Sequence, residues 1–130
     1  MILIDTSAWV EFLRDTSSPE CREVDRLLSS DIASCDVVSM ELFAGARDDS
    51  HLRDLRGLLA RTSLLDIQSV DYESAASLYR RCRAQGETVR RLVDCLIASV
   101  AIRHGVPILH RDGDFSAISR HCQLVIHRPK

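Results

Sequence analysis

The sequence predicts a three-layer α/β/α domain, residues 1–130, in which a central parallel sheet of four to five strands lies between layers of helices. Short apolar runs that suit buried strands alternate with amphipathic segments of helical length. Strands that are separated by helices pair in parallel and leave helices on both faces of the sheet. The length of 130 residues is typical of one domain, and no repeat, linker or low-complexity tract divides the chain.

The expected strands are short apolar runs bounded by acidic or turn-forming residues. The first covers residues 1–5, and a fully apolar run forms a strand at residues 106–109. Three further strands are expected at residues 32–35, 64–67 and 123–126. Such short apolar runs suit a small sheet that is covered on both faces.

The expected helices begin at residues that favour helix starts and carry one apolar face. Thr6 or Ser7 caps the first helix, and Ser18-Pro19 opens the second. Asp36 caps the third helix and Asp71 the fifth. Helices are expected at residues 6–13, 18–30, 36–45, 50–61, 71–85, 91–103 and 115–120.

Composition and cysteine usage exclude several classes of protein. Hydrophobic residues make up 45% of the chain and charged residues 28%, as in an ordinary globular domain. The longest uncharged apolar run, residues 95–102, is too short to span a membrane, and the N-terminus lacks a signal peptide pattern, so the expected location is the cytoplasm. The five cysteines are widely spaced with no Cys-x-x-Cys pair, which predicts core residues rather than disulfides or a zinc finger.

The basic residues are unusual in type and in distribution. The net charge is −2, and the 17 basic residues are all arginines except Lys130. Several arginines lie around Gly86, namely Arg80, Arg81, Arg83, Arg90 and Arg91. Guanidinium groups bind phosphate well, so the group predicts either an RNA-binding patch or, with equal weight, a solvated helix face in a protein that favours arginine over lysine.

Four acidic residues follow or interrupt apolar runs, where an unpaired charge is costly to bury. Asp5 ends the first strand, Asp112 follows the fully apolar strand, and Glu41 and Asp94 lie near the starts of their helices. In a parallel sheet, sites form beyond the carboxyl ends of the strands, and helix N-termini there favour negative charge. If the two strands are neighbours, these acids and Asp114 share one edge, where a divalent cation is their natural partner.

Each acid also has a simpler structural explanation. Asp5 can cap the first helix, and Glu41 and Asp94 can each pair with a buried arginine. Asp112-Gly113-Asp114 can form a tight turn, or a zinc site with His110 if two further ligands come from elsewhere. Because helix capping and turns would not place all the acids at one edge, their shared position favours an all-oxygen metal site.

The acids lie within a series of short motifs. These are Ile4-Asp5-Thr6-Ser7, Ser39-Met40-Glu41-Leu42 with Gly45, Asp94-Cys95-Leu96-Ile97-Ala98, and Ile108-Leu109-His110-Arg111-Asp112-Gly113-Asp114-Phe115. In this order and spacing, over nearly the whole chain, they resemble the motifs of PIN-domain ribonucleases and, among these, of the VapC-like toxins of prokaryotic toxin–antitoxin pairs.

The resemblance implies a PIN-like fold and a function. The protein would be a toxin, a metal-dependent endoribonuclease that hydrolyses RNA phosphodiester bonds. A cognate VapB-like antitoxin would inhibit it, and the protein would form a homodimer and a hetero-oligomer with that antitoxin. Apolar residues on the helices at 18–30 and 50–61 are candidates for the dimer surface or, equally, for the core.

Carried over to this sequence, the resemblance implies that Asp5, Glu41, Asp94 and Asp112 are the catalytic acids. They would bind one or two Mg²⁺ or Mn²⁺ ions. Asp114 is implied as a further metal ligand or as an acid that supports the ligands.

Residues beside these acids are candidates for supporting roles. His110 stands where the family usually has Thr or Ser, and it could bind phosphate, contact a water or alter the metal preference. Ser7 orients a ligand or substrate oxygen, or else caps the first helix. Arg111 contacts phosphate, or else lies on the surface. Glu11 either faces solvent or reaches back toward the acids.

Two other functions fit parts of the pattern. A metal-dependent phosphatase or a phospho-accepting receiver domain also has an aspartate after its first strand, but these proteins normally use a lysine, and the single lysine here is Lys130. A non-catalytic PIN-like binding module would use the acidic pocket to hold a basic partner. The complete set of acids favours the nuclease over both alternatives.

Overall fold

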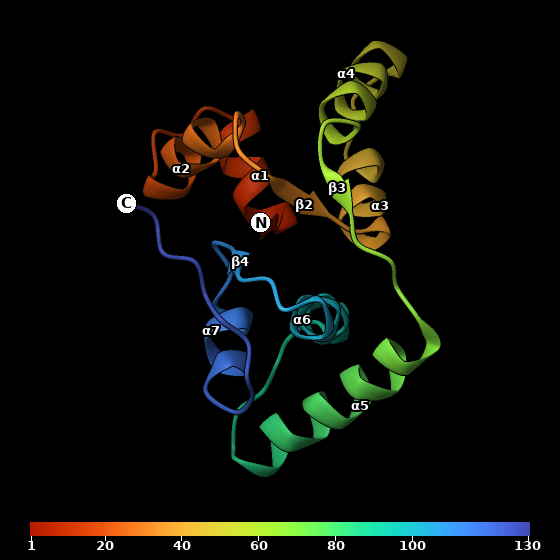
Figure 1. The fold of residues 1–130 in the computed structure, drawn as a ribbon, viewed down its shortest axis with the longest axis vertical. Helices are drawn as coiled ribbons and strands as arrows, with labels where there is room; N and C mark the ends of the chain where they lie inside the picture. Colours follow the sequence, from red (N-terminus) through yellow and green to blue (C-terminus); the bar gives the residue numbers. More distant parts are fainter.

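Four strands form one parallel sheet in the order β3-β2-β1-β4 (Figure 1). The structure, a computed structural model, describes residues 1–130. Its strands are β1 (Ile2–Ile4), β2 (Ile32–Ser34), β3 (Ser63–Leu64) and β4 (Ile108–Leu109). Leu3 pairs with both Ala33 and Ile108, which puts β1 between β2 and β4. The expected parallel sheet is confirmed, and β1 and β4 are neighbours, as the predicted site requires.

The fifth expected strand, at residues 123–126, is reduced to a single parallel bridge between Ile126 and Ile108. The N–H of Ile108 donates to the carbonyl of Val125 at 3.0 Å, and its carbonyl accepts from the N–H of His127 at 2.8 Å. Because β4 has only two residues, the C-terminal segment cannot form a longer ladder of hydrogen bonds with it.

Seven helices surround the sheet. They are α1 (Thr6–Leu13), α2 (Pro19–Leu27), α3 (Asp36–Ala44), α4 (Asp49–Leu59), α5 (Ser69–Ala84), α6 (Leu92–His104) and α7 (Gly113–Ser119). In Figure 1, α5, α6 and α7 lie on one side of the sheet, and α1 and α2 lie on the other. The architecture is therefore the three-layer α/β/α sandwich that the sequence predicts.

The caps of three helices differ from the prediction, and α4 and α7 begin one and two residues earlier than expected. Asp5 caps α1, as its simpler structural explanation proposed, in place of Thr6 or Ser7. Cys35 precedes α3, so Asp36 is its first residue rather than its cap. Asp71 lies in the first turn of α5, where its Oδ2 accepts from the N–H of Gln68 at 2.8 Å. An acid inside the first turn can reach back to a free N–H, so sequence alone does not separate the two positions.

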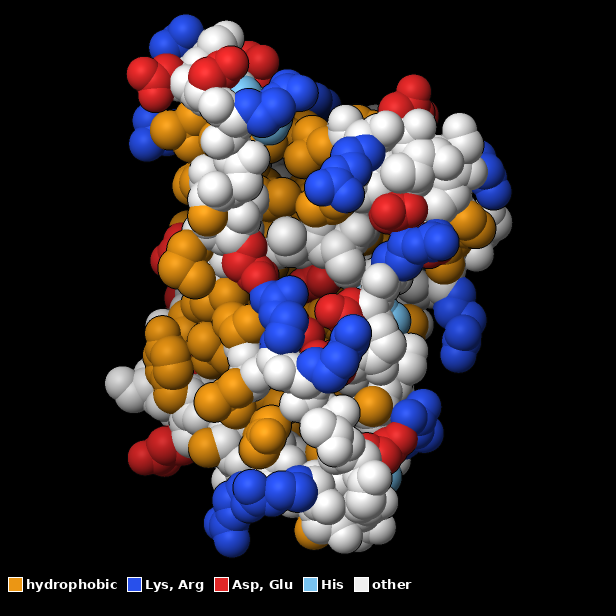
Figure 2. Space-filling model, turned by 180° about the vertical axis from the view of Figure 1, so that it is seen from behind, with side chains coloured by type: hydrophobic (Ala, Val, Ile, Leu, Met, Phe, Trp, Pro, Cys, Tyr) orange, Lys and Arg blue, Asp and Glu red, His pale blue; other side chains and the backbone are white.

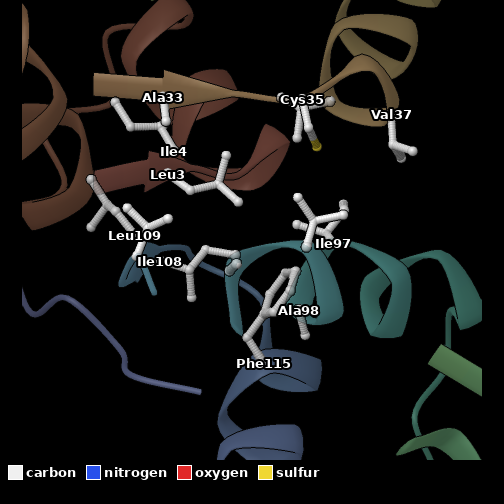
Figure 3. Close-up of a cluster of buried hydrophobic side chains, with 14 of the residues drawn as sticks. Leu3, Ile4, Ala33, Cys35, Val37, Ile97, Ala98, Ile108, Leu109 and Phe115 are labelled. Carbon is white, nitrogen blue, oxygen red and sulfur yellow. The ribbon is translucent and has the colours of Figure 1, made fainter. Parts of the chain in front are cut away.

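The core fixes the elements that carry the acids. It is one cluster of 30 buried residues that spans the sheet and the helices. Figure 3 shows Leu3 and Ile108, which pair across β1 and β4, together with Ile97 of α6 and Phe115 of α7 in this cluster. Because α6 and α7 each carry an acid in their first turn, this packing determines where those acids lie.

The cysteines are confirmed as unpaired residues that are largely buried. All five are free, and only Cys122 is partly exposed. Burial, the largest effect, raises the pKa of Cys95 to about 12, so this thiol stays protonated at neutral pH.

The helices expected to form a dimer surface contribute most of their apolar residues to the core instead. These are Cys21, Val24 and Leu27 of α2 and Leu55 and Leu59 of α4, all of which are buried. Large exposed apolar side chains occur elsewhere, for example Met40, Leu64 and Leu92. None of the seven helices combines the length and apolar character needed to cross a bilayer.

Candidate metal centre

The expected acids meet beyond the carboxyl ends of β1 and β4. Asp5 directly follows β1, and Asp112 lies three residues after β4. Carboxylate oxygens of Asp94, Asp112 and Asp114 lie within 4.8 Å of one another. Asp5 lies close enough to both Glu41 and Asp94 for their charges to repel. The structure thus brings all five predicted acids to one edge of the sheet.

Asp94 is the most deeply buried acid of the group. It is the third residue of α6, and the residue is 1% exposed. Its Oδ2 is buried and has no hydrogen-bond partner. Burial, the largest effect, raises the pKa of Asp94 to about 8. A carboxylate in such a place is satisfied by a proton or by a cation, so the orphaned oxygen fits a metal ligand.

Asp5 combines its role in the acidic site with its role as a helix cap. Its Oδ2 accepts from the backbone N–H of Ser7 at 3.0 Å and from the Ser7 hydroxyl at 2.6 Å. Both bonds use Oδ2, which leaves Oδ1 for another partner. Burial raises the pKa of Asp5 above its ordinary value despite these bonds. Capping therefore orients the carboxylate and does not remove it from the site.

Ser7 connects the two strand ends that carry acids. Besides donating to Asp5, its hydroxyl oxygen accepts from the backbone N–H of Arg111 at 2.9 Å, in the loop between β4 and α7. Ser7 therefore holds the Asp5 carboxylate in place and ties it to the loop of Asp112, which supports the expectation that it orients a ligand.

Replacing Ser7 by alanine should weaken metal binding without unfolding the protein. The change leaves one backbone bond to the Asp5 carboxylate and frees its orientation, and loss of such a supporting contact typically lowers metal affinity about 10- to 100-fold. Mn²⁺ titration calorimetry measures the affinity, and Ser7→Thr, which keeps the hydroxyl, is the matched control. Wild-type affinity in Ser7→Ala would show that the hydroxyl does not orient a ligand.

Glu41 lies in the second turn of α3, near the start of the helix as expected. The hydroxyl of Thr6 donates to its Oε1 at 2.9 Å, and the Nη2 of Arg91 contacts its Oε2. The same nitrogen lies 4.0 Å from the Oδ1 of Asp94. An arginine partner for Glu41 and Asp94 therefore exists, but its side chain is 44% exposed rather than buried.

Asp112 is the N-cap of α7, so residues 112–114 are a helix start and not the tight turn that was the alternative. Its Oδ1 accepts from the N–H of Asp114 at 2.9 Å and from the Nη2 of Arg90 at 2.8 Å. The N–H of Asp112 donates to the Nδ1 of His110 at 3.0 Å. Burial lowers the pKa of His110, which favours the neutral ring that this bond requires. The position of His110 thus supports the backbone that carries Asp112.

Arg111 and Glu11 lie together outside the acidic group. The Nη1 of Arg111 donates to Glu20 at 2.8 Å, and its Nε lies 3.5 Å from Glu11. Glu11 also accepts from the hydroxyl of Thr16 at 2.8 Å. Arg111 therefore joins α1 and α2 to the β4–α7 loop, and Glu11 does not reach back toward the metal site.

Sequence reasoning missed the contacts that Thr6, Arg90 and Arg91 make with the acids. Arg91 lies three residues before Asp94, a helical spacing that places side chains on one face and could have identified it. Thr6 and Arg90 contact acids that are 35 and 22 residues away along the chain, and the sequence gives no signal for these pairs.

Comparison with known proteins agrees with the fold. The family model of the PIN domain matches residues 2–121. Ribonuclease VapC11 of Mycobacterium tuberculosis is 49% identical over 124 residues, which cover 92% of this chain and 92% of that protein.

Solved structures show the same fold at lower sequence identity. VapBC-1 from nontypeable Haemophilus influenzae superposes with a TM-score of 0.77 at 18% identity, covering 98% of each chain. Mycobacterium tuberculosis VapC20, described as a sarcin–ricin loop cleaving toxin, gives a TM-score of 0.70 at 20% identity and covers 99% of this chain and 100% of its own. The match to the family model and the identity to VapC11 show that the chain belongs to the PIN-domain family and, within it, to the VapC ribonucleases.

Proposed function

We propose that this protein is an endoribonuclease that hydrolyses RNA phosphodiester bonds with Mg²⁺ or Mn²⁺. Asp5, Glu41, Asp94 and Asp112 would hold the cation. The observation that carries the proposal is the buried, unpartnered Oδ2 of Asp94 within a group of carboxylates. A site built from carboxylate oxygens suits hard divalent cations such as Mg²⁺ and Mn²⁺.

The protein's own residues prepare the site for this chemistry. When bound, a divalent cation offsets the negative charge that develops on phosphate during hydrolysis. Asp94 is fixed by the buried α6 and must lose its proton to bind. Asp5 is oriented by Ser7, and Asp112 by the cap of α7. These contacts place the ligands before substrate arrives, which lowers the cost of ordering them during the reaction.

The histidines are held in other contacts, which argues against catalysis by a histidine base. The side chains of His104, His121 and His127 each contact a carboxylate, of Asp66, Glu87 and Glu23 respectively. His51 and His110 each accept a backbone N–H through Nδ1. Of these, His110 lies beside the acids, and burial keeps its pKa low. Metal-dependent hydrolysis therefore suits the site better than acid–base chemistry by histidine.

The relatives support RNA as the substrate and an antitoxin as the partner. VapC11 is named a ribonuclease, and VapC20 is described as cleaving the sarcin–ricin loop. Several solved neighbours are VapBC complexes. We accordingly propose that this protein is a toxin of the cytoplasm that a small VapB-like antitoxin inhibits, and that it forms a homodimer and a hetero-oligomer with that antitoxin.

Binding of Mn²⁺ should tighten as the pH rises toward 8. The pKa of Asp94 is raised to about 8, so below this pH a proton must leave before the carboxylate can bind a cation. The affinity should rise by up to about tenfold per pH unit between about pH 6 and 8. Calorimetry in buffers of different ionisation enthalpy measures the released proton. An affinity independent of pH, with no proton released, would contradict the assignment of Asp94.

The activity is tested with purified protein, free of partner, and a structured RNA. Cleavage should require Mg²⁺ or Mn²⁺, stop in EDTA and be lost in Asp5→Asn. Asp54→Asn is the matched control, because Asp54 is an exposed acid of α4 outside the acidic site. Undiminished cleavage in Asp5→Asn would overturn the assigned site. Metal binding without any cleavage of RNA would favour the non-catalytic binding module.

A further inference from the structure

Basic side chains from one short segment form ion pairs with the acids of the site. Arg90 and Arg91 immediately precede α6. The Nη2 of Arg90 lies 2.8 Å from Asp112, and the Nη2 of Arg91 contacts Glu41. Figure 2 shows basic side chains lying against acidic ones near the middle of one face of the molecule. The two guanidinium groups therefore contact acids that we propose as metal ligands.

Asp114 anchors the backbone of this arginine pair. Its Oδ1 accepts from the backbone N–H of Arg90 at 3.1 Å, and its Oδ2 accepts from that of Arg91, also at 3.1 Å. The Nε of Arg90 lies 3.4 Å from the same Oδ1. Asp114 is 3% exposed, so these bonds are sheltered from water. With a backbone partner on each oxygen, Asp114 is better placed to hold the arginines than to bind a cation.

The arginine heads, in contrast to the carboxylates that they contact, are largely open to solvent. The side chains of Arg90 and Arg91 are 69% and 44% exposed. A half-exposed ion pair is worth little, so a divalent cation of the same total charge can replace the two guanidinium groups at modest cost. A displaced guanidinium would stay within one side-chain length of the acids, and its planar fork suits a phosphate group.

We infer that Arg90 and Arg91 are internal counter-cations of the acidic site that exchange with the divalent metal and then bind the phosphate backbone of the RNA, with Asp114 as their positioning residue. The inference deepens the proposed function and rests on it. It assigns two roles to the arginine pair. In the metal-free protein the guanidinium groups compete with the metal for the acids, and in the metal-bound protein they bind the phosphate groups of the substrate.

If the arginines have both roles, one substitution should strengthen metal binding and weaken the binding of RNA. Arg91→Gln should bind Mn²⁺ about three- to fivefold more tightly than wild type, because a competing cation is gone. The same variant should show a KM for RNA raised about tenfold, with a smaller change in kcat, because a phosphate contact is lost. A purely structural arginine would not improve metal binding when removed. Arg53→Gln, an exposed arginine of α4, is the control and should leave both values unchanged.

Asp114→Asn separates positioning from metal ligation. The amide keeps one acceptor oxygen, so Mn²⁺ affinity should stay within about threefold of wild type, whereas the KM for RNA should rise as in Arg91→Gln. Loss of Mn²⁺ binding as severe as in Asp94→Asn would make Asp114 a ligand and overturn the inference. Melting temperatures of each variant confirm that the fold is retained.

The inference and the proposed function fail in different ways. If wild-type protein binds Mn²⁺ and cleaves RNA but Arg91→Gln binds Mn²⁺ no more tightly, the counter-cation role is wrong and the nuclease stands. If wild-type protein neither binds Mn²⁺ nor cleaves RNA, the metal site itself is wrong, and the inference falls with it.

Discussion

Asp94→Asn will abolish RNA cleavage, lowering kcat by about 1000-fold or more, which corresponds to about 4 kcal/mol of transition-state stabilisation. Asp94 supplies a buried oxygen that no protein group satisfies, so no neighbouring side chain can take over its role. Single-turnover cleavage of a labelled RNA in saturating Mn²⁺ measures the rate. A loss of less than about tenfold would show that Asp94 is peripheral to the chemistry.

The same substitution should stabilise the metal-free protein at high pH. A carboxyl whose pKa is raised to about 8 binds a proton in the folded state but not in the unfolded state between about pH 4 and 8, so it costs stability as the pH rises. An amide at this position has no charge to bury and can donate to the Asp114 carboxylate. In EDTA at pH 8.5, the melting temperature should rise by about 3–6 °C for each 1 kcal/mol gained.

The pH dependence supplies the control for this effect. At pH 5 the buried carboxyl of Asp94 is protonated and neutral, so the variant and wild type should have similar melting temperatures. Equal destabilisation at pH 5 and 8.5 would show that the substitution disturbs packing and does not relieve a buried charge.

Phe115→Ala should cost about 3–5 kcal/mol of the free energy of unfolding. Phe115 is completely buried in α7 beneath α6, and its ring lies 5.3 Å from the ring of His110. The cavity would open directly behind Asp114 and loosen the start of α7, so metal affinity should fall together with stability. Urea unfolding followed by circular dichroism measures the free energy, and Mn²⁺ calorimetry measures the affinity.

Phe115→Leu tests whether this loss comes from the cavity. A leucine fills part of the space and should restore more than half of the lost stability, because the cost of a large-to-small change grows with the remaining cavity. A loss of less than about 1 kcal/mol in Phe115→Ala would mean that the core beneath the acids can collapse and does not fix their position.

The position of the acids could be predicted because it follows from topology. Asp5 and Asp112 follow apolar strands, and the carboxyl ends of parallel strands share one edge whatever the side chains beyond them do. Asp94 faces the same edge because it lies near the start of α6, and helix N-termini lie at that edge of a parallel sheet. The pairing of β1 with β4 had to be assumed, because the sequence of a strand does not indicate which other strand pairs with it.

Contacts between distant side chains could not be predicted in this way. Arg91 meets Glu41 across 50 residues, and Arg90 meets Asp112 across 22, through rotamers and loop geometry that leave no periodic pattern. Helix starts and the fate of the C-terminal strand were also missed in detail. Asp71 reaches back from inside its helix, and β4 is too short to pair with all of residues 123–126. Capping residues and apolar runs in the sequence do not show where a helix starts to the exact residue or how long the neighbouring strand is.

The central claim is that metal-dependent hydrolysis at the acids cleaves the RNA, without a histidine base. The chemical nature of the RNA ends tests this claim most directly. Attack by water leaves ordinary phosphate and hydroxyl ends, whereas attack by the RNA 2′-hydroxyl leaves a 2′,3′-cyclic phosphate. Mass spectrometry of the products from wild-type protein in Mn²⁺ should show no cyclic phosphate, and no product should form in EDTA. Cyclic phosphate ends formed in EDTA would contradict the account.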